Sequence, residues 1–142
     1  MEFCLDPTPQ GIAEMGVAQW FMEKTGKEFF GYRCLGVARD GVLKAAILCD
    51  RFSKIECQMH IYAEPGFMWA SPELCRTAFA FPFILLDRRR ITVETPVTHP
   101  RMIRINRKLG FIEEGVKRCA ADDGSDAIIF GMLREECKWI KD

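Results

Sequence analysis

The feature that most restricts the fold is the dipeptide Asp40-Gly41, which separates two apolar runs at residues 32–39 and 42–49. Both residue types tolerate the positive φ angles of a type I′ turn, and this turn joins neighbouring antiparallel strands. A further strand is predicted over residues 55–63, where Glu64-Pro65-Gly66 ends the run. The middle of the chain is therefore predicted to consist of three consecutive strands.

Helical patterns lie on both sides of these strands. A short strand at residues 2–5 is followed by a predicted helix that ends near Gly26. Its entry is marked by Asp6, Pro7, Thr8 and Pro9, and its apolar face by Ile12, Met15, Ala18 and Met22 at helical spacing.

A second helix is predicted to begin at Ser71-Pro72, with serine as the N-cap and proline in the first turn. It is expected to run to about Leu86, and Pro82 should remove one backbone hydrogen bond and kink it. A third, short helix should start at His99-Pro100 and end at Leu109-Gly110, because glycine is the usual C-terminal stop.

The remaining strands are predicted at residues 90–97, 111–119 and 126–133, the last two joined by a hairpin at Asp122-Asp123-Gly124-Ser125. The element order is β-α-β-β-β-α-β-α-β-β, which predicts an α/β (α+β) fold with a mixed, mostly antiparallel sheet and helices on its faces. No internal repeat or linker divides the 142 residues, so a single domain over residues 1–142 is expected.

Composition excludes several classes of protein. Twenty basic and twenty acidic side chains cancel, which argues against a general nucleic-acid surface, although Arg88-Arg89-Arg90 forms a local basic run. Two histidines and scattered cysteines lack the clustering of a metal site, so no metal is expected. The seven cysteines are interpreted as small core residues of a reducing, cytoplasmic protein. We find no signal peptide and no run long enough for a membrane helix.

Several motifs in the second half occur in a recognisable order. They are the strand Arg89–Glu94, the run from His99 to Phe111 that closes on Lys108-Leu109-Gly110-Phe111, and Glu113-Glu114-Gly115. Together they resemble the GNAT superfamily of N-acetyltransferases. The closing segment Gly131–Trp139 is similar to GNAT-like proteins of phages and prophages.

The resemblance implies a definite chemistry. Members of the family bind acyl-CoA in a V-shaped opening between two splayed parallel strands, here about residues 57–63 and 90–97. A backbone N–H of the first strand polarises the thioester, and N–H groups in the loop before the next helix hold the pyrophosphate. The residues implied for acetyl-CoA binding are Ile61, Ala63, Trp69, Ala70, Ser71, Arg76, His99 and Arg104.

Two positions depart from the family pattern. The family has two glycines in its pyrophosphate loop, whereas the corresponding stretch here aligns Phe67 and Trp69 with them. Asn106 occupies the position at which family members often place a tyrosine general acid, and an amide cannot donate a proton as a phenol can. The first departure removes the glycines that let the backbone approach the pyrophosphate of CoA. The second removes the usual general acid.

His60 is the leading candidate for a catalytic base, because an imidazole beside the thioester could take the proton of an attacking amine. Glu56 and Gln58 share its strand face and could relay the proton, and Glu94 on the opposing strand is an alternative base. Plain solvent exposure of each side chain is the competing interpretation.

Aromatic residues gather around the second predicted helix: Phe67, Trp69, Phe79, Phe81 and Phe83, with Met68 between the first two. They are interpreted either as core residues or as a surface for a partner.

Two functions remain open at this point. The first is an acetyl-CoA-dependent N-acetyltransferase acting on an amine. The second is a binding or phage-assembly protein that kept the fold and lost CoA, and that would act through a protein partner. A homodimer is left open, and no membrane partner is expected. Specific acetyl-CoA binding would discriminate between the two functions.

Overall fold

The hairpin at Asp40-Gly41 is present, and the φ angles of 54° and 76° at these residues fit a type I′ turn. It joins β2 (Arg33–Arg39) to β3 (Val42–Asp50) in the computed structural model, which describes residues 2–6, 16–68 and 71–141. The third predicted strand of this run is β4 (Glu56–Ala63), which pairs antiparallel with β3.

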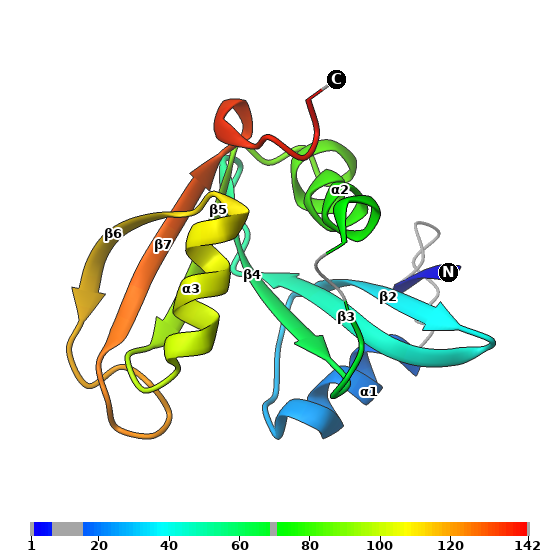
Figure 1. Cartoon of the computed structure of the whole chain (residues 1–142), viewed down its shortest axis with the longest axis horizontal. Helices are drawn as coiled ribbons and strands as arrows, with labels where there is room; N and C mark the ends of the chain where they lie inside the picture. Colours follow the sequence, from blue (N-terminus) through cyan, green and yellow to red (C-terminus); the bar gives the residue numbers. More distant parts are fainter. Residues whose placement is uncertain (1, 7–15, 69–70, 142) are drawn as a thin grey trace.

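One seven-stranded sheet runs in the order β1-β2-β3-β4-β5-β7-β6 (Figure 1). The strand pair β4 and β5 is parallel, and the other neighbours are antiparallel. The order of strands and helices predicted from the sequence is confirmed. The other strands are β1 (Glu2–Asp6), β5 (Arg90–Pro96), β6 (Ile112–Lys117) and β7 (Ala127–Leu133).

The parallel pair is short. Glu56–Gln58 lie beside Arg90–Thr92, and beyond these residues β4 and β5 diverge, as Figure 1 shows. The splayed central strands expected from the family resemblance are therefore present.

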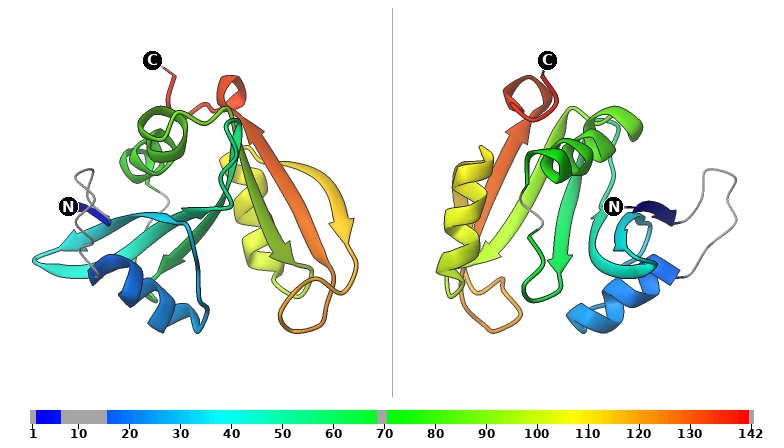
Figure 2. Two further views of the ribbon diagram at one scale, coloured as in Figure 1. Left: turned by 180° about the vertical axis from the view of Figure 1, so that it is seen from behind. Right: turned by 45° about the vertical axis from the view of Figure 1, so that its right-hand side comes forward.

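The helices cover both faces of the sheet (Figure 2). The helix α1 (Gly16–Thr25) packs Val17, Ala18 and Phe21 against one face of β2 and β3. On the other face, α2 (Pro72–Ala80) and α3 (Pro100–Leu109) close the main core. Of the predicted helix entry, Asp6 belongs to β1, while Pro7–Pro9, Ile12 and Met15 lie outside the described residues.

The helix predicted to reach Leu86 changes type at Pro82. The α-helix ends at Ala80, and a π-helical turn, η1 (Phe81–Leu85), follows, in which Leu86 N–H donates to the Phe81 carbonyl. Proline has no N–H to donate to the preceding turn, so the wider turn accommodates it. At the end of α3, Gly110 adopts φ 109° and the predicted stop is confirmed.

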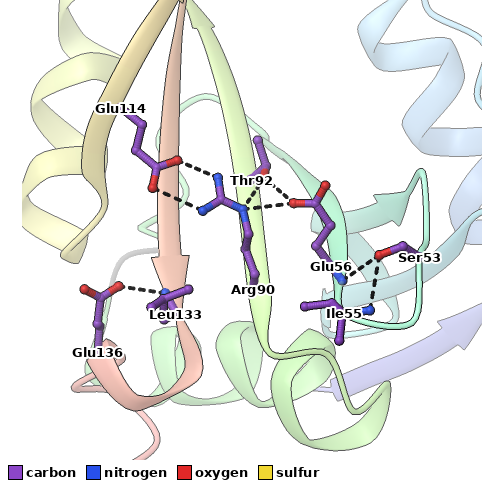
Figure 3. A network of polar contacts seen from close by, with 8 residues as sticks. All are labelled: Ser53, Ile55, Glu56, Arg90, Thr92, Glu114, Leu133 and Glu136. Atoms are coloured by element: carbon purple, nitrogen blue, oxygen red, sulfur yellow. Dashed lines mark hydrogen bonds and ion pairs between the residues drawn. The ribbon is translucent and has the colours of Figure 1, made fainter.

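A polar network joins β4 and β5 where they still run side by side, at the narrow end of the V-shaped opening between them (Figure 3). Arg90 on β5 donates from Nε to Glu56 Oε2 on β4 at 2.9 Å, and both Nη atoms donate to the carboxylate of Glu114 at 3.1 and 2.5 Å. Glu114 sits at an irregularity in the pairing of β6 with β7, and its carboxylate crosses β7 above Gly131. Arg90 is therefore a structural ion-pair residue and not part of an open basic patch.

The other two arginines of the basic run have different surroundings. Arg88 donates to the Leu86 carbonyl and lies 5.1 Å above the Phe52 ring, while Arg89 is exposed.

The cysteines are mostly core residues, as interpreted from the sequence. Cys34, Cys49, Cys57, Cys75 and Cys137 are buried, whereas Cys119 is exposed in the β6–β7 connection. Burial raises the pKa of the Cys75 thiol to about 11. Of the aromatic set, Phe79, Phe81 and Phe83 are buried, so core packing is the correct interpretation for these three. No helix in the described ranges is long and apolar enough to span a membrane.

Candidate active site

His60 and Asp50 form the centre of the candidate site. Strand alternation places His60 on the α1 face of β4, opposite to the buried Met59. The register of β3 with β4 pairs Leu48 with His60 and Asp50 with Gln58, so Asp50 lies diagonally across from the imidazole. The His60 Nε2 to Asp50 Oδ1 distance is 2.9 Å.

The pair is held in a defined geometry. Asp50 is only 6% exposed, and the Phe29 ring lies 4.7 Å from the imidazole, centroid to centroid. A carboxylate can only accept, so the bond to Asp50 places the imidazole proton on Nε2. Nδ1 then carries the free lone pair and can accept a proton.

His60 borders two cavities. The larger, of about 600 Å³, lies on the α1 face, is open to solvent, and is flanked by the segment after α1 and by the β6–β7 connection. The ion pair between Lys27 Nζ and Asp122 Oδ2, at 3.1 Å, joins these two walls. The acidic residues of its lining are Glu28, Asp50, Glu94 and Asp122, and its aromatic residues are Phe29 and Phe30.

The smaller cavity, of about 200 Å³, lies where β4 and β5 diverge, and α3 closes it. Ile61 from β4, Val93 from β5 and Met102 from α3 give it apolar walls. His60 and Glu94 belong to the linings of both cavities. The two spaces therefore adjoin at the predicted bases.

Several predicted site residues come together here. His60, Glu94, Asn106, Ile61 and His99 all line the smaller cavity. Glu94 is held by Lys117, with 2.5 Å between Oε1 and Nζ. Asn106 is 2% exposed and donates from Nδ2 to Thr95 Oγ1 at 2.9 Å, which fastens α3 to β5.

Other predicted residues lie apart from this group. Ala63 packs with a small cluster under α2, and Arg76 and Arg104 are exposed on their helices. Ser71 caps α2, with its Oγ accepting the Leu74 N–H at 3.3 Å. Trp69 and Ala70 lie outside the described residues. Two residues were expected to relay a proton from His60. Gln58 lines the larger cavity, whereas Glu56 is bound to Arg90.

The loop after β4 accommodates Phe67 without filling the cavity between the strands. Gly66 takes φ 84°, and the Phe67 N–H donates to the Glu64 carbonyl at 3.0 Å. The Phe67 side chain packs against a cluster that contains Val37 and Leu74. It lines neither cavity, so its bulk leaves the opening between β4 and β5 free.

The outer end of β4 is anchored to α1. Lys24 Nζ lies 2.9 Å from Glu64 Oε1, and the Tyr62 hydroxyl donates to Glu64 Oε2 at 3.2 Å. The hydrogen bond from Lys24 is the main cause that lowers the pKa of Glu64. Trp20 packs edge-on against Tyr62, with ring centroids 5.5 Å apart. These contacts fasten β4, one of the two diverging strands, to α1.

Asp50, Phe29 and Arg51 also line the larger cavity, and no motif in the sequence points to them. Asp50 directly follows the predicted strand 42–49, and only the register of β3 with β4 brings it to His60. Among the described residues, no group of three or more histidine, cysteine or acidic side chains could hold a metal ion.

No family model matches the sequence, and no curated protein sequence matches it. Solved structures do match. A chimera of the spermidine N-acetyltransferase SpeG from Vibrio cholerae with hSSAT aligns with a TM-score of 0.74 at 15% identity, covering 100% of both chains. A SpeG point mutant from Vibrio cholerae gives 0.68 at 18% identity, over 87% of this chain and 76% of that one.

A third match is the Campylobacter jejuni N-acetyltransferase PseH, solved in complex with acetyl coenzyme A. Its TM-score is 0.61 at 12% identity, over 82% of this chain and 77% of that one. At such identities the likeness concerns the fold, and it shows that this chain has the GNAT fold. These matches do not support the link to phage proteins that was expected from the sequence.

Proposed function

We propose that the protein is an acetyl-CoA-dependent N-acetyltransferase that transfers an acetyl group to a small primary amine. The observation that carries the proposal is the position of His60, which is bonded to Asp50 and borders both cavities. A base at this junction can act on an amine in one cavity while the amine faces an acetyl group in the other.

The smaller cavity suits the acetyl donor. When bound, acetyl-CoA supplies an activated acetyl thioester, and its narrow pantetheine arm is compatible with an apolar slot between β4 and β5. Ile61, Val93 and Met102 give the slot this character. The N-terminus of α2 with its Ser71 cap is the proposed anion site for the pyrophosphate, because helix N-termini present unpaired N–H donors.

The larger cavity suits the acceptor. An amine arrives mainly as an ammonium ion, and the carboxylates of Asp50 and Glu94 attract positive charge near His60. His60 Nδ1 accepts a proton from the amine, directly or through water, and Asp50 stabilises the resulting imidazolium. The nitrogen lone pair then forms the N–C bond as the C–S bond breaks. The new amide nitrogen loses its second proton to solvent, and the departing thiolate takes up a proton.

Asn106 has a positioning role in this proposal. Its amide holds α3 against β5 through Thr95 and thereby keeps Met102 at the slot. The alternative of a non-catalytic binding protein rested partly on Phe67. That side chain packs away from the slot, and the second residue aligned with a glycine of the pyrophosphate loop, Trp69, lies outside the described residues.

The test measures thiol release from acetyl-CoA with a panel of small primary amines. For the best acceptor, His60→Gln should lower kcat roughly 10²- to 10⁴-fold, the contribution of a general base, with unchanged affinity for acetyl-CoA. Asp50→Asn should also lower kcat, because an amide that donates to Nε2 leaves the proton on Nδ1.

Glu94→Gln is the matched comparison, since Glu94 borders the same two cavities. A smaller loss than that of His60→Gln identifies His60 as the base. Full activity of His60→Gln, or a larger loss in Glu94→Gln, would contradict the assignment. Absence of transfer to any amine would contradict the enzymatic function itself.

A further inference from the structure

Arg51 has an unusual backbone conformation at the wall of the larger cavity. Its φ angle is 52°, in the left-handed region that side chains with a Cβ rarely adopt. In a regular strand Asp50 and Arg51 would point to opposite faces of the sheet. Because the strand ends at Asp50 and the chain turns, both residues line the same cavity.

The charges around Arg51 are otherwise largely matched. Asp50 is bonded to His60, Glu94 to Lys117, and Asp122 to Lys27. The Arg51 guanidinium has no hydrogen bond, ion pair or ring contact with any residue that the structure describes. The remaining carboxylate of the cavity, Glu28, is not within salt-bridge distance of it. Among the residues that the structure describes, the guanidinium of Arg51 and the carboxylate of Glu28 are thus the two charges of the lining without an ion-pair partner.

We propose that Arg51 binds an oxyanion, a carboxylate or a phosphate, carried by the acceptor amine. The proposal rests on the proposed acetyltransferase function and names its substrate class. A guanidinium presents a planar fork of donors that matches two oxygens of either anion. Since Arg51 directly follows the partner of His60, a small molecule can place its amine at His60 and its oxyanion at Arg51.

Two aromatic side chains of the cavity lining, Phe29 and Phe30, suit the linker between the amine and the oxyanion of such a molecule. Phe29 packs on His60, and Phe30 lines the same cavity although its side chain is 80% exposed. A short hydrocarbon linker would cover these rings. The similar structure from Vibrio cholerae is that of a spermidine N-acetyltransferase. Spermidine is a polycation, so Arg51 would repel it.

The experiment compares matched acceptors in the acetyl-transfer assay. The carboxylate pair is β-alanine and β-alaninamide, the phosphate pair is 2-aminoethyl phosphate and ethanolamine, and spermidine is the polycationic probe. All values of kcat/KM are corrected for the fraction of free amine. We expect one anionic acceptor to exceed its neutral partner by roughly 10- to 100-fold, the range of a hydrogen bond to a charged group. The pair with the larger ratio identifies the anion.

Arg51→Gln should bring the ratio of kcat/KM for the anionic acceptor over that for its neutral partner close to one, through a loss with the anionic acceptor. Arg89→Gln is the control, because Arg89 is also an exposed arginine but lines neither cavity, and it should keep the preference. Preference for spermidine or for both neutral amines in the parent protein would overturn the proposal. An equal loss with both members of a pair in Arg51→Gln would also overturn it.

A binding measurement separates this proposal from the enzymatic one. N-acetyl-β-alanine and N-acetyl-β-alaninamide, and the N-acetylated phosphate pair, are titrated into the parent and Arg51→Gln without turnover. Tighter binding of an anionic compound, lost in Arg51→Gln, supports the oxyanion site even if no acetyl transfer occurs. Equal binding within both pairs by the parent contradicts the oxyanion site even if transfer is fast.

Discussion

The carboxylate of Asp123 joins two loops at the edge of the larger cavity. Its Oδ1 accepts from the Ser125 hydroxyl and from the Ser125 N–H at 2.9 Å, and its Oδ2 accepts from the Thr98 hydroxyl at 2.6 Å. Thr98 precedes α3, whereas Asp123 and Ser125 belong to the β6–β7 connection. The hydrogen bonds from Ser125 and Thr98 lower the pKa of Asp123 from 3.8 to about 2.

This pKa predicts a dependence of stability on pH. Between 3.8 and about 2 the unfolded chain binds more protons at this group than the folded protein does. The contribution of Asp123 to stability is therefore complete about one pH unit above 3.8, and it is lost as the pH falls through 3.8 toward 2. Asp123→Asn should show a smaller decline of Tm than the parent over this interval, measured by thermal unfolding.

Thr98→Val is the graded control, because it removes one of the three donors to Asp123. Its Tm profile should lie between those of the parent and Asp123→Asn. Parallel profiles of all three proteins between pH 4 and 2 would show that Asp123 does not contribute in this way.

At the scale of elements, the ion-pair network of Arg90 joins three strands at the narrow end of the V (Figure 3). The hydrogen bond from Arg90 lowers the pKa of Glu114, so the pair is ionised at neutral pH. Glu114 reaches Arg90 across β7 only because Gly131 has no side chain. A Cβ at Gly131 would lie 2.5 Å from Glu114 Oε1.

This geometry predicts a non-additive pair of substitutions. Gly131→Ala should lower the free energy of unfolding by about 1 kcal/mol, because the added Cβ displaces the Glu114 carboxylate from Arg90. In a Glu114→Ala background the same substitution should cost nothing, since the obstructing carboxylate is absent. Denaturant unfolding of the parent, both single variants and the double variant measures this coupling. Additive effects would show that Glu114 does not require the space above Gly131.

Element order was predictable because each element has a local signal. The Asp40-Gly41 turn, the Ser71-Pro72 helix start and the Gly110 stop depend on the conformations that these residues favour, and all three are present. The His60–Asp50 pair was not predictable in full. It depends on the register across the turn at residues 51–55, and a single sequence does not specify that register.

The surroundings of the three arginines in the basic run were likewise not predictable from the sequence. Arg88-Arg89-Arg90 is uniform in sequence, yet one guanidinium covers a phenyl ring, one is exposed and one bridges two carboxylates. The partners of Arg90 lie 34 and 24 residues away in the chain. Contacts of this kind arise only from tertiary structure.

At the scale of the whole molecule, the V separates two packed halves. One arm, β4, is fastened to α1 by Lys24, Glu64 and Tyr62, and the other arm, β5, is fastened to α3 through Thr95 and Asn106. Arg90 closes the narrow end, and the ion pair Lys27–Asp122 links two walls of the larger cavity. Each arm thus has its own support, and the slot between them stays open.

Acetyl transfer as proposed requires that the slot between β4 and β5 binds acetyl-CoA, and calorimetric titration of the protein with acetyl-CoA measures this binding. Met102→Trp should fill the slot from α3, whereas Arg101→Trp places the same indole on the exposed surface one residue away. We predict micromolar binding to the parent and to Arg101→Trp, and binding at least about tenfold weaker to Met102→Trp, a difference of about 1.4 kcal/mol. No binding to the folded parent at millimolar acetyl-CoA, or equal binding to all three proteins, would contradict the claim.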